Sequence, residues 1–252
     1  MQVNGSLQID GTLENPVKFQ GIHTEKEYSE IPAQWKGIEF KEQSQNSVIN
    51  YATIKNAQTA IAASNNQNIT IANCKIENAY HNGVFIENTN TLIYNTLIHN
   101  CGKSCINVGG SGNYTILNCT LADYWSYNFR ENATFTANGN NQDFSALVVN
   151  SIIDGNHNNE IDFNQNDNIN FVNCLIKSNL EQNEKYTSCK FNLDPEFANL
   201  DSADFRLKAT SPAVDMANFG FLMLYDYLET DYFGNLRTED DNPDAGFAEF
   251  IK

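Results

Sequence analysis

The sequence predicts an all-β fold: a right-handed parallel β-helix with about 22–23 residues per coil and a C-terminal capping segment. Three observations predict it, namely a repeat that runs through most of the chain, an abundance of asparagine, and a shortage of helix-forming stretches. The 252 residues include 39 asparagines, and most lie between Asn46 and Asn199. Asparagine favours turns over helices. Charged residues make up only 18%, so the composition favours strands and turns.

The first part of the chain contains incomplete copies of the repeat, within residues 1–45. A solenoid that begins at an open strand edge exposes unpaired backbone groups. We therefore expect further coils upstream of Met1. The opening residues are polar and lack the basic start and apolar stretch of a signal peptide.

Six copies of the repeat occupy the middle of the chain. One column of matching positions begins with tyrosine, continues with asparagine and advances by 22, 22, 23, 32 and 23 residues: Tyr51, Asn73, Asn95, Asn118, Asn150 and Asn173. A second column, which marks an earlier strand of each copy, is formed by Ile38, Ile61, Val84, Ile106, Phe129 and Ile161. Both columns share one insertion of about nine residues, which we place near residues 132–142.

A period of 22–23 residues with short β-type segments is typical of one coil of a solenoid. Successive coils pair as strands of parallel sheets and add roughly 4.8 Å each. Stacked asparagine amides hydrogen-bond at that same spacing, so we expect asparagine ladders in the turns. Leucine-rich repeats share the period, but their Leu-x-x-Leu-x-Leu consensus is missing. We predict about six coils between Ile38 and Leu180.

Six cysteines are present, and their spacing lacks the Cys-x2-Cys pattern of a zinc site. Cys74, Cys119 and Cys174 share one column but occupy alternate coils, so we expect stacked, buried thiols that are too far apart to bond. Cys101 and Cys105 flank one turn and can pair, whereas Cys189 stands alone. Cysteine usage therefore does not decide the compartment, and we expect no metal site.

After Cys189 the repeat stops, which divides the domain into a β-helix over residues 1–190 and a cap or anchor-associated segment over residues 191–252. The second part carries the motifs Asp-Pro-Glu-Phe (194–197), Asp-Phe-Arg-Leu (204–207), Ser-Pro-Ala-Val-Asp (211–215), Asp-Tyr-Phe-Gly-Asn-Leu-Arg (231–237) and Pro-Asp-Ala-Gly-Phe-Ala-Glu (243–249). Asp-Pro and Ser-Pro end regular structure, and repeated Asp and Arg satisfy turn backbone. We interpret this segment as a cap over the last coil.

These motifs, together with residues 11–19 and 34–38, resemble those of bacterial, Bacteroidota-like right-handed β-helix proteins of the choice-of-anchor type. The resemblance covers nearly the whole chain, although Met216-Ala-Asn218 stands where the family usually has Asp-Ala-Gly. It implies a pectate-lyase-like fold and an extracytoplasmic protein, secreted or anchored at the outer surface as lipoproteins are. It does not imply one activity, because a fold hosts many functions.

The charge balance limits the partners. The formal net charge is −16, from 31 acidic and 15 basic residues, which disfavours nucleic acid and anionic membrane surfaces. No stretch approaches the roughly 20 apolar residues of a membrane span. We expect a monomer whose partner is a polysaccharide or surface glycan.

Candidate site residues lie where outward side chains of successive coils should gather. Inward and outward positions alternate along a strand, and we expect Arg130, Glu160 and Asp162 to point outward with the rest. The candidates for catalysis are Lys103, His81 and Arg130. The candidates for substrate binding are Tyr80, Phe85, Asn107, Tyr124, Trp125, Tyr127, Glu160 and Asp162.

Three functions stay open for this surface. We favour non-catalytic glycan binding, because aromatic faces stack on sugar rings and flanking amides and carboxylates bind hydroxyls. A lyase needs a cation and a base, and a hydrolase needs two carboxylates such as Glu160 and Asp162. In a lyase these two acids can hold Ca²⁺, but we expect no resident cofactor. A structural surface protein or adhesin is the third possibility.

Overall fold

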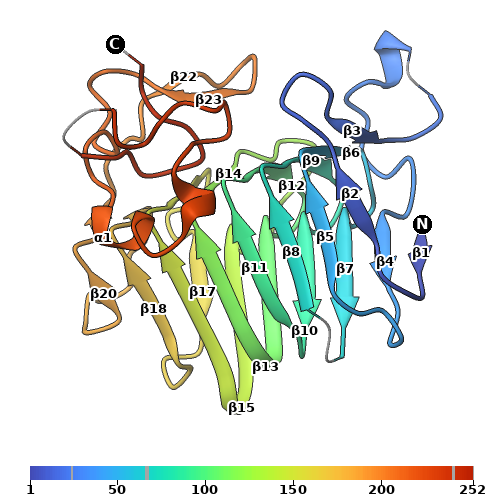
Figure 1. Cartoon of the computed structure of the whole chain (residues 1–252), viewed down its shortest axis with the longest axis horizontal. Helices are drawn as coiled ribbons and strands as arrows, with labels where there is room; N and C mark the ends of the chain where they lie inside the picture. The colour runs from blue at the N-terminus through green and yellow to red at the C-terminus, as the bar shows by residue number, and fades with distance from the viewer. Residues whose placement is uncertain (24, 66–67, 240–241, 252) are drawn as a thin grey trace.

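The computed structural model describes residues 1–23, 25–65, 68–239 and 242–251. The chain winds through three faces of one parallel β-helix, and the coils stack from the N-terminal to the C-terminal part of the molecule (Figure 1). All pairings between coils are parallel among the described residues, which confirms the predicted parallel β-helix. In this described part of the chain, no helix is long and apolar enough to cross a membrane.

Each coil contributes one strand to each of three faces, which we call the first, second and third sheets. The first sheet contains β1 (Gln2–Val3), β4 (Ile38–Phe40), β7 (Ile61–Ser64), β10 (Val84–Glu87), the starts of β13 (Ile106–Leu117) and β15 (Phe135–Val149), and β17 (Ile161–Phe163). The second sheet contains β2 (Gln8–Asp10), β5 (Ser47–Asn50), β8 (Asn68–Ala72), β11 (Asn90–Tyr94), the ends of β13 and β15, β18 (Ile169–Val172) and β20 (Tyr186–Thr187). The third sheet contains β3 (Val17–Phe19), β6 (Ala52–Lys55), β9 (Lys75–Ala79), β12 (Leu97–Cys101), β14 (Thr120–Asp123), β16 (Ile152–Gly155), β19 (Leu175–Ile176) and β21 (Lys190–Phe191).

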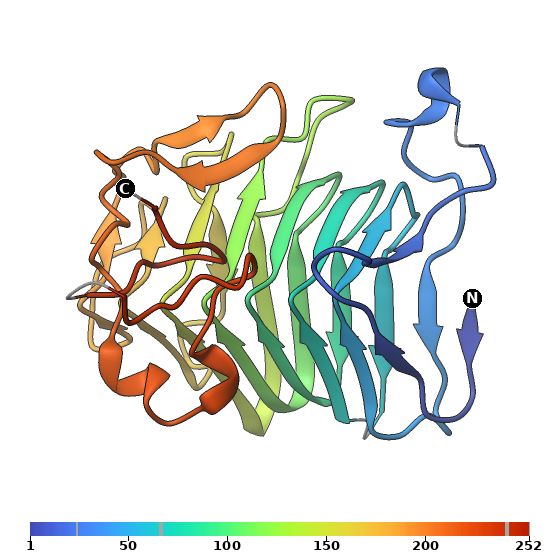
Figure 2. The same cartoon turned by 45° about the horizontal axis from the view of Figure 1, so that its top comes forward.

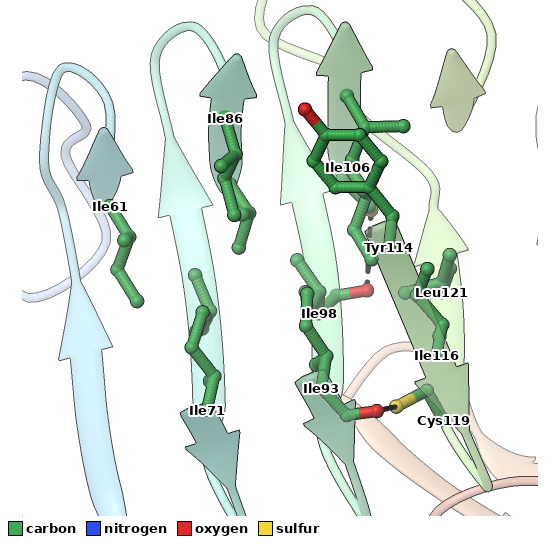
Figure 3. Close-up of a cluster of buried hydrophobic side chains, with 14 of the residues drawn as sticks. Ile61, Ile71, Ile86, Ile93, Ile98, Ile106, Tyr114, Ile116, Cys119 and Leu121 are labelled. Carbon is green, nitrogen blue, oxygen red and sulfur yellow. Dashed lines mark hydrogen bonds between the residues drawn. The ribbon is translucent and has the colours of Figure 1, made fainter. Parts of the chain in front are cut away.

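The core forms because alternate apolar side chains of the strands in each sheet point inward. Figure 3 shows isoleucines such as Ile61, Ile71 and Ile98 directed into the same interior. Ile38 pairs with Ile61, and Ile61 with Val84, in the register that the repeat predicts. This burial of aligned apolar side chains fixes the register, because a slip of one residue would turn every one of them outward.

The insertion is placed differently from the prediction. Ile106 pairs with Phe135, not with Phe129, and Phe129 is 83% exposed. Most of the extra residues therefore lie in the loop before Phe135, which we call the insertion loop (residues 124–134). A smaller part lies between the two halves of β15, where the register with β13 shifts. The prediction fails because apolar character alone does not distinguish Phe129 from Phe135.

The asparagine column of the repeat marks a sharp turn between the second and third sheets. The backbone φ angle lies between 47° and 51° at all five asparagines of this column: Asn73, Asn95, Asn118, Asn150 and Asn173. Asparagine tolerates this left-handed conformation better than other residues with a Cβ. The repeat therefore keeps asparagine here for its backbone conformation.

Ladders of stacked amides do form, but at two other corners. At the ends of the third-sheet strands, the Asn78 amide donates to Asn56 Oδ1 at 2.7 Å and the Asn100 amide donates to Asn78 Oδ1 at 3.1 Å. Between the first and second sheets, Asn68 donates to Asn46 and Asn90 donates to Asn68. The predicted ladders are thus confirmed at these two corners.

The segment after Cys189 packs along the side of the helix, which differs from the predicted position over the end of the last coil. It runs back along the outside of the helix, where the antiparallel hairpin of β22 (Phe197–Asn199) and β23 (Asp204–Leu207) lies (Figure 2). Its apolar residues pack on outward residues of the third sheet: Leu97, Ala122, Ile152 and Leu175. The helices α1 (Phe219–Leu222) and η2 (Asp226–Leu228) pack on the second sheet. A further short helix, η1 (Lys26–Tyr28), belongs to the N-terminal loop.

All six cysteines are free thiols. Cys74, Cys119 and Cys174 are fully buried in one inward column, as predicted. Burial raises the pKa of the Cys74 and Cys119 thiols to about 12, and the Cys119 thiol donates to the Ile93 carbonyl (Figure 3). Cys101 and Cys105 lie within hydrogen-bonding reach of each other but are not bonded covalently.

Candidate functional site

The first sheet carries a hollow because its outward side chains differ in size. The β7 row presents only the small side chains of Ala62 and Ser64, between Glu39 of β4 and Phe85 of β10. The result is an open hollow of about 630 Å³, which we call the Phe85 slot. Its lining comprises Asn4, Glu39, Phe40, Lys41, Glu42, Gln43, Ala62, Ala63, Ser64, Phe85 and Glu87.

The slot is acidic. Glu39, Glu42 and Glu87 line it together with one lysine, Lys41. Lys41 pairs with Glu39, and this hydrogen bond is the main reason that the pKa of Glu39 lies below its usual value. The slot therefore presents carboxylates that can accept hydrogen bonds from a ligand.

The slot has the dimensions and the chemistry for one extended chain of sugar rings. Two strand spacings separate β4 from β10, which gives a width of roughly 9–10 Å. Phe85 is partly exposed on one side, and an aromatic ring offers a flat apolar face to a sugar ring. Carboxylates and the Gln43 amide on the other side are suited to accept and donate hydrogen bonds to hydroxyls.

A second surface, which we call the ridge, lies where the chain enters the first sheet. It consists of Tyr80, His81, Lys103 and Tyr127, with the Trp125 ring 6.3 Å from Tyr80 and 4.9 Å from Tyr127. Tyr80 is 41% exposed and Tyr127 is 52% exposed, whereas Trp125 is 1% exposed. The Tyr127 hydroxyl donates to the Glu30 carbonyl, which ties the insertion loop to the N-terminal loop. Burial, assisted by Lys103, lowers the pKa of His81.

Arg130 and Glu160 do not point outward, so this part of the site prediction is wrong. The Arg130 side chain is 1% exposed, and its Nη2 lies 2.6 Å from Glu160 Oε1. Asp123 Oδ2 lies 3.7 Å from Arg130 Nη1. Arg130 was misread because the register runs through Phe135, which places Thr136 where we expected Arg130. Glu160 lies in the predicted register beside Ile161, but its position in the coil is buried on other coils as well, at Ala60 and Cys105.

Asp162 is exposed, whereas Glu160 is fully buried. The two therefore do not form a pair of carboxylates on the same surface. The Tyr124 side chain points away from the rest of the insertion loop. Its hydroxyl donates to Asp154 at 2.5 Å, and its ring stacks on Phe205. Burial raises the Tyr124 pKa well above the usual range. Tyr124 lines a separate hollow of about 370 Å³ beside Lys177 and Asp194.

The structure thus divides the predicted residues into groups. Phe85 and Asn107 are neighbours on the first sheet, and Tyr80, His81, Lys103, Trp125 and Tyr127 form or support the ridge. The sequence analysis missed the slot acids and Lys41. The signal was present in the outward columns, where the small pair Ala62 and Ser64 lies between larger residues.

Comparison with known families agrees with this architecture. The family model described as the right-handed beta helix region matches residues 36–183. The chain belongs to this right-handed β-helix family. No match was found among curated proteins. In this right-handed β-helix, the matched region includes every slot residue except Asn4, whereas the segment after Cys189 lies outside it. The Bacteroidota-like origin and the choice-of-anchor type stay predictions.

Proposed function

We propose that this right-handed β-helix binds a neutral polysaccharide or surface glycan without cleaving it, and that it does so outside the cytoplasm. The Phe85 slot carries the proposal, because it combines an aromatic face with hydrogen-bonding groups in an open hollow of about 630 Å³. The location outside the cytoplasm rests on the resemblance of the C-terminal motifs.

The charge of the slot favours a neutral ligand over an acidic one. Three glutamates face one lysine along the lining, and the whole chain has a formal net charge of −16. Uronate or sulfate groups would meet repulsion both in the slot and during approach. Neutral hydroxyls instead gain hydrogen bonds to ionised carboxylates, which are the stronger kind.

Burial of Arg130 and Glu160 weakens the case for catalysis. An arginine-dependent lyase loses its candidate arginine to an ion pair inside the protein. A hydrolase that uses Glu160 with Asp162 loses one of its two carboxylates. His81 and Lys103 remain at the surface of the ridge, so a lyase at the ridge is the alternative that the experiment must distinguish.

The test measures binding to a panel of neutral and acidic polysaccharides, together with release of new chain ends with and without Ca²⁺. We expect retention on a neutral polysaccharide and no new chain ends. Phe85→Ala should weaken this binding by about tenfold, because the loss of one stacking platform is worth about 1–1.5 kcal/mol. Ala62→Leu should also weaken it by filling the slot with a larger side chain.

Phe129→Ala is the matched control, because it removes an equally apolar ring that is 83% exposed and outside the slot. Equal binding by Phe85→Ala and wild type would contradict the slot assignment. Failure to retain any neutral glycan would favour a structural protein. Chain ends released from an acidic polysaccharide, and lost in Lys103→Ala, would favour a lyase at the ridge.

A further inference from the structure

The inward column that contains Cys74, Cys119 and Cys174 has a further cysteine that the repeat period conceals. Cys74, Cys119 and Cys174 alternate with Thr96 and Ser151, so no two of these cysteines lie on neighbouring coils. The last coil is shorter, and β19 pairs with β21 in the register Leu175 to Lys190. Cys189 therefore lies directly beside Cys174 on the next coil.

The thiol contacts show that Cys189 occupies the same inward position. Cys174 Sγ lies 3.3 Å from the Val172 carbonyl, two residues earlier, and 3.4 Å from a carbonyl of the preceding coil. Cys189 Sγ has the equivalent pair, at 3.6 Å from Thr187 O and 3.5 Å from Phe171 O. Strands in a parallel sheet are about 4.8 Å apart, which lies within the Cα separation that a disulfide spans.

Accessibility distinguishes this pair from the other one. Cys101 and Cys105 are also adjacent, but both are fully buried. Cys189 is partly exposed, because no further coil packs on its outer side among the described residues. The hydrogen bond from the Cys174 thiol lowers the pKa of Cys189, whereas burial raises the pKa of Cys174. A nucleophilic thiol at the surface thus lies beside a protonated thiol in the core.

We propose that Cys189 is a thiol-exchange site that reacts with low-molecular-weight disulfides and passes the bond to Cys174. The Cys189 thiolate attacks one sulfur of the small disulfide, and the first small thiolate leaves. The Cys174 sulfur then attacks Cys189 sulfur, and the second small thiolate leaves. Two protein thiols are oxidised, the small disulfide is reduced to two thiols, and these take up the two protons.

The product is a disulfide between the last two coils. β20 and β21 each pair with a strand on one side only in the described part of the chain. Such an edge opens more readily than the interior coils. A covalent link from Cys189 to Cys174 ties this terminal coil to the coil before it, so exchange alters the dynamics of the helix end.

The experiment treats the fully reduced native chain with 5,5′-dithiobis(2-nitrobenzoate) and follows the coloured thiolate and the protein mass. We expect about two equivalents of thiolate, no retained adduct and an internal Cys174–Cys189 bond. Cys174→Ser should release about one equivalent and keep the adduct on Cys189. Cys189→Ser should abolish the rapid reaction. Amide exchange in β20 and β21 should slow after oxidation of the wild type.

Serine is a suitable replacement because Ser151 already occupies this column on another coil. Cys105→Ser is the control for the buried pair and should leave the release unchanged. A stable adduct on the wild type, without an internal bond, would overturn the proposal. So would rapid reaction of Cys189→Ser, since another thiol would then be the accessible one.

Discussion

Polar groups find their hydrogen-bond partners in different ways in the turns of the repeat and in the segments where the chain leaves the repeat. Inside the repeat, each turn lies directly above an identical turn, so amide side chains stack. Asn56, Asn78 and Asn100 form such a ladder with donor–acceptor distances of 2.7 and 3.1 Å. Neutral amides suffice there because the neighbouring coil supplies the partner.

Where the chain leaves the repeat, a buried arginine takes over. In the insertion loop, Arg130 donates to the carbonyls of Asp123 and Asn132. In the C-terminal segment, Arg237 donates to the carbonyls of Asp244 and Gly246. Both guanidinium groups also bind a carboxylate, and both are at most 1% exposed.

The comparison explains why an arginine was misread as catalytic. A loop that departs from the coils loses ladder partners, and its carbonyls must find other donors. The five N–H groups of one guanidinium serve several carbonyls at once. Arg130 is therefore a structural counterpart of Arg237, despite lying beside the predicted site.

The largest expected effect comes from removing either arginine. Arg130→Ala and Arg237→Ala should each lower the free energy of unfolding by about 3–5 kcal/mol, because each removes the partner of buried carboxyl groups and leaves two buried carbonyls without their donor. Urea unfolding followed by circular dichroism measures this loss. Arg206→Ala is the control, since its side chain is 60% exposed and pairs with Asp204 at the surface.

We expect the Arg206 control to change stability by less than about 1 kcal/mol. If Arg130→Ala unfolded at the same urea concentration as wild type, the buried cluster would have no stabilising role. Arg130 in the insertion loop and Arg237 in the C-terminal segment would then not have the same structural role.

Sequence reasoning predicted the repeated part of the fold well for a physical reason. Each coil repeats the same inward positions, so Ile38, Ile61 and Val84 report one register several times. The insertion occurs once, and a single apolar residue such as Phe129 gives no second copy against which to check it. The C-terminal segment was misplaced because its motifs do not show which face of the helix they cover.

The candidate site was predicted less well because burial of polar groups depends on the register and on which coil positions face solvent. Arg130 and Glu160 were expected at the surface, but the register shift moves Arg130 into the insertion loop, and Glu160 lies at a position that is buried on other coils too. Phe85 lies in the regular coils, and its outward position was predicted correctly. The slot beside it depends on small neighbours, which only a comparison of side-chain sizes along the column reveals.

The pH dependence of stability should sharpen the comparison, since each arginine cluster contains a carboxyl with a raised pKa. Burial is the main cause that raises the pKa of Asp123 to about 7 and that of Glu249 to about 8. In the unfolded chain these groups ionise near pH 4. The folded state therefore holds protons more tightly, so this stabilisation is present at low pH and is lost as pH rises toward 8.

We expect the free energy of unfolding to fall on the order of a few kcal/mol between pH 5 and 9 from these two groups. Asp123→Asn should flatten the decline below pH 7, and Glu249→Gln should flatten it over the whole range below pH 8. Urea unfolding across this range measures both slopes. A decline of unchanged steepness in the double variant would assign it to general charge repulsion instead.

The smallest expected effect tests whether the ladder amides themselves stabilise the turns. Asn78 and Asn118 are both buried with φ of 58° and 49°, but Asn78 bonds to neighbouring amides, whereas the amide atoms of Asn118 have no hydrogen-bond partner among the described residues. Glycine keeps this conformation, so Asn78→Gly should cost about 1–2 kcal/mol and Asn118→Gly much less. Alanine at either position should cost about 1 kcal/mol more, because it strains the left-handed turn. Equal losses for the two glycine variants in urea unfolding would mean that conformation, and not the ladder, stabilises the repeat.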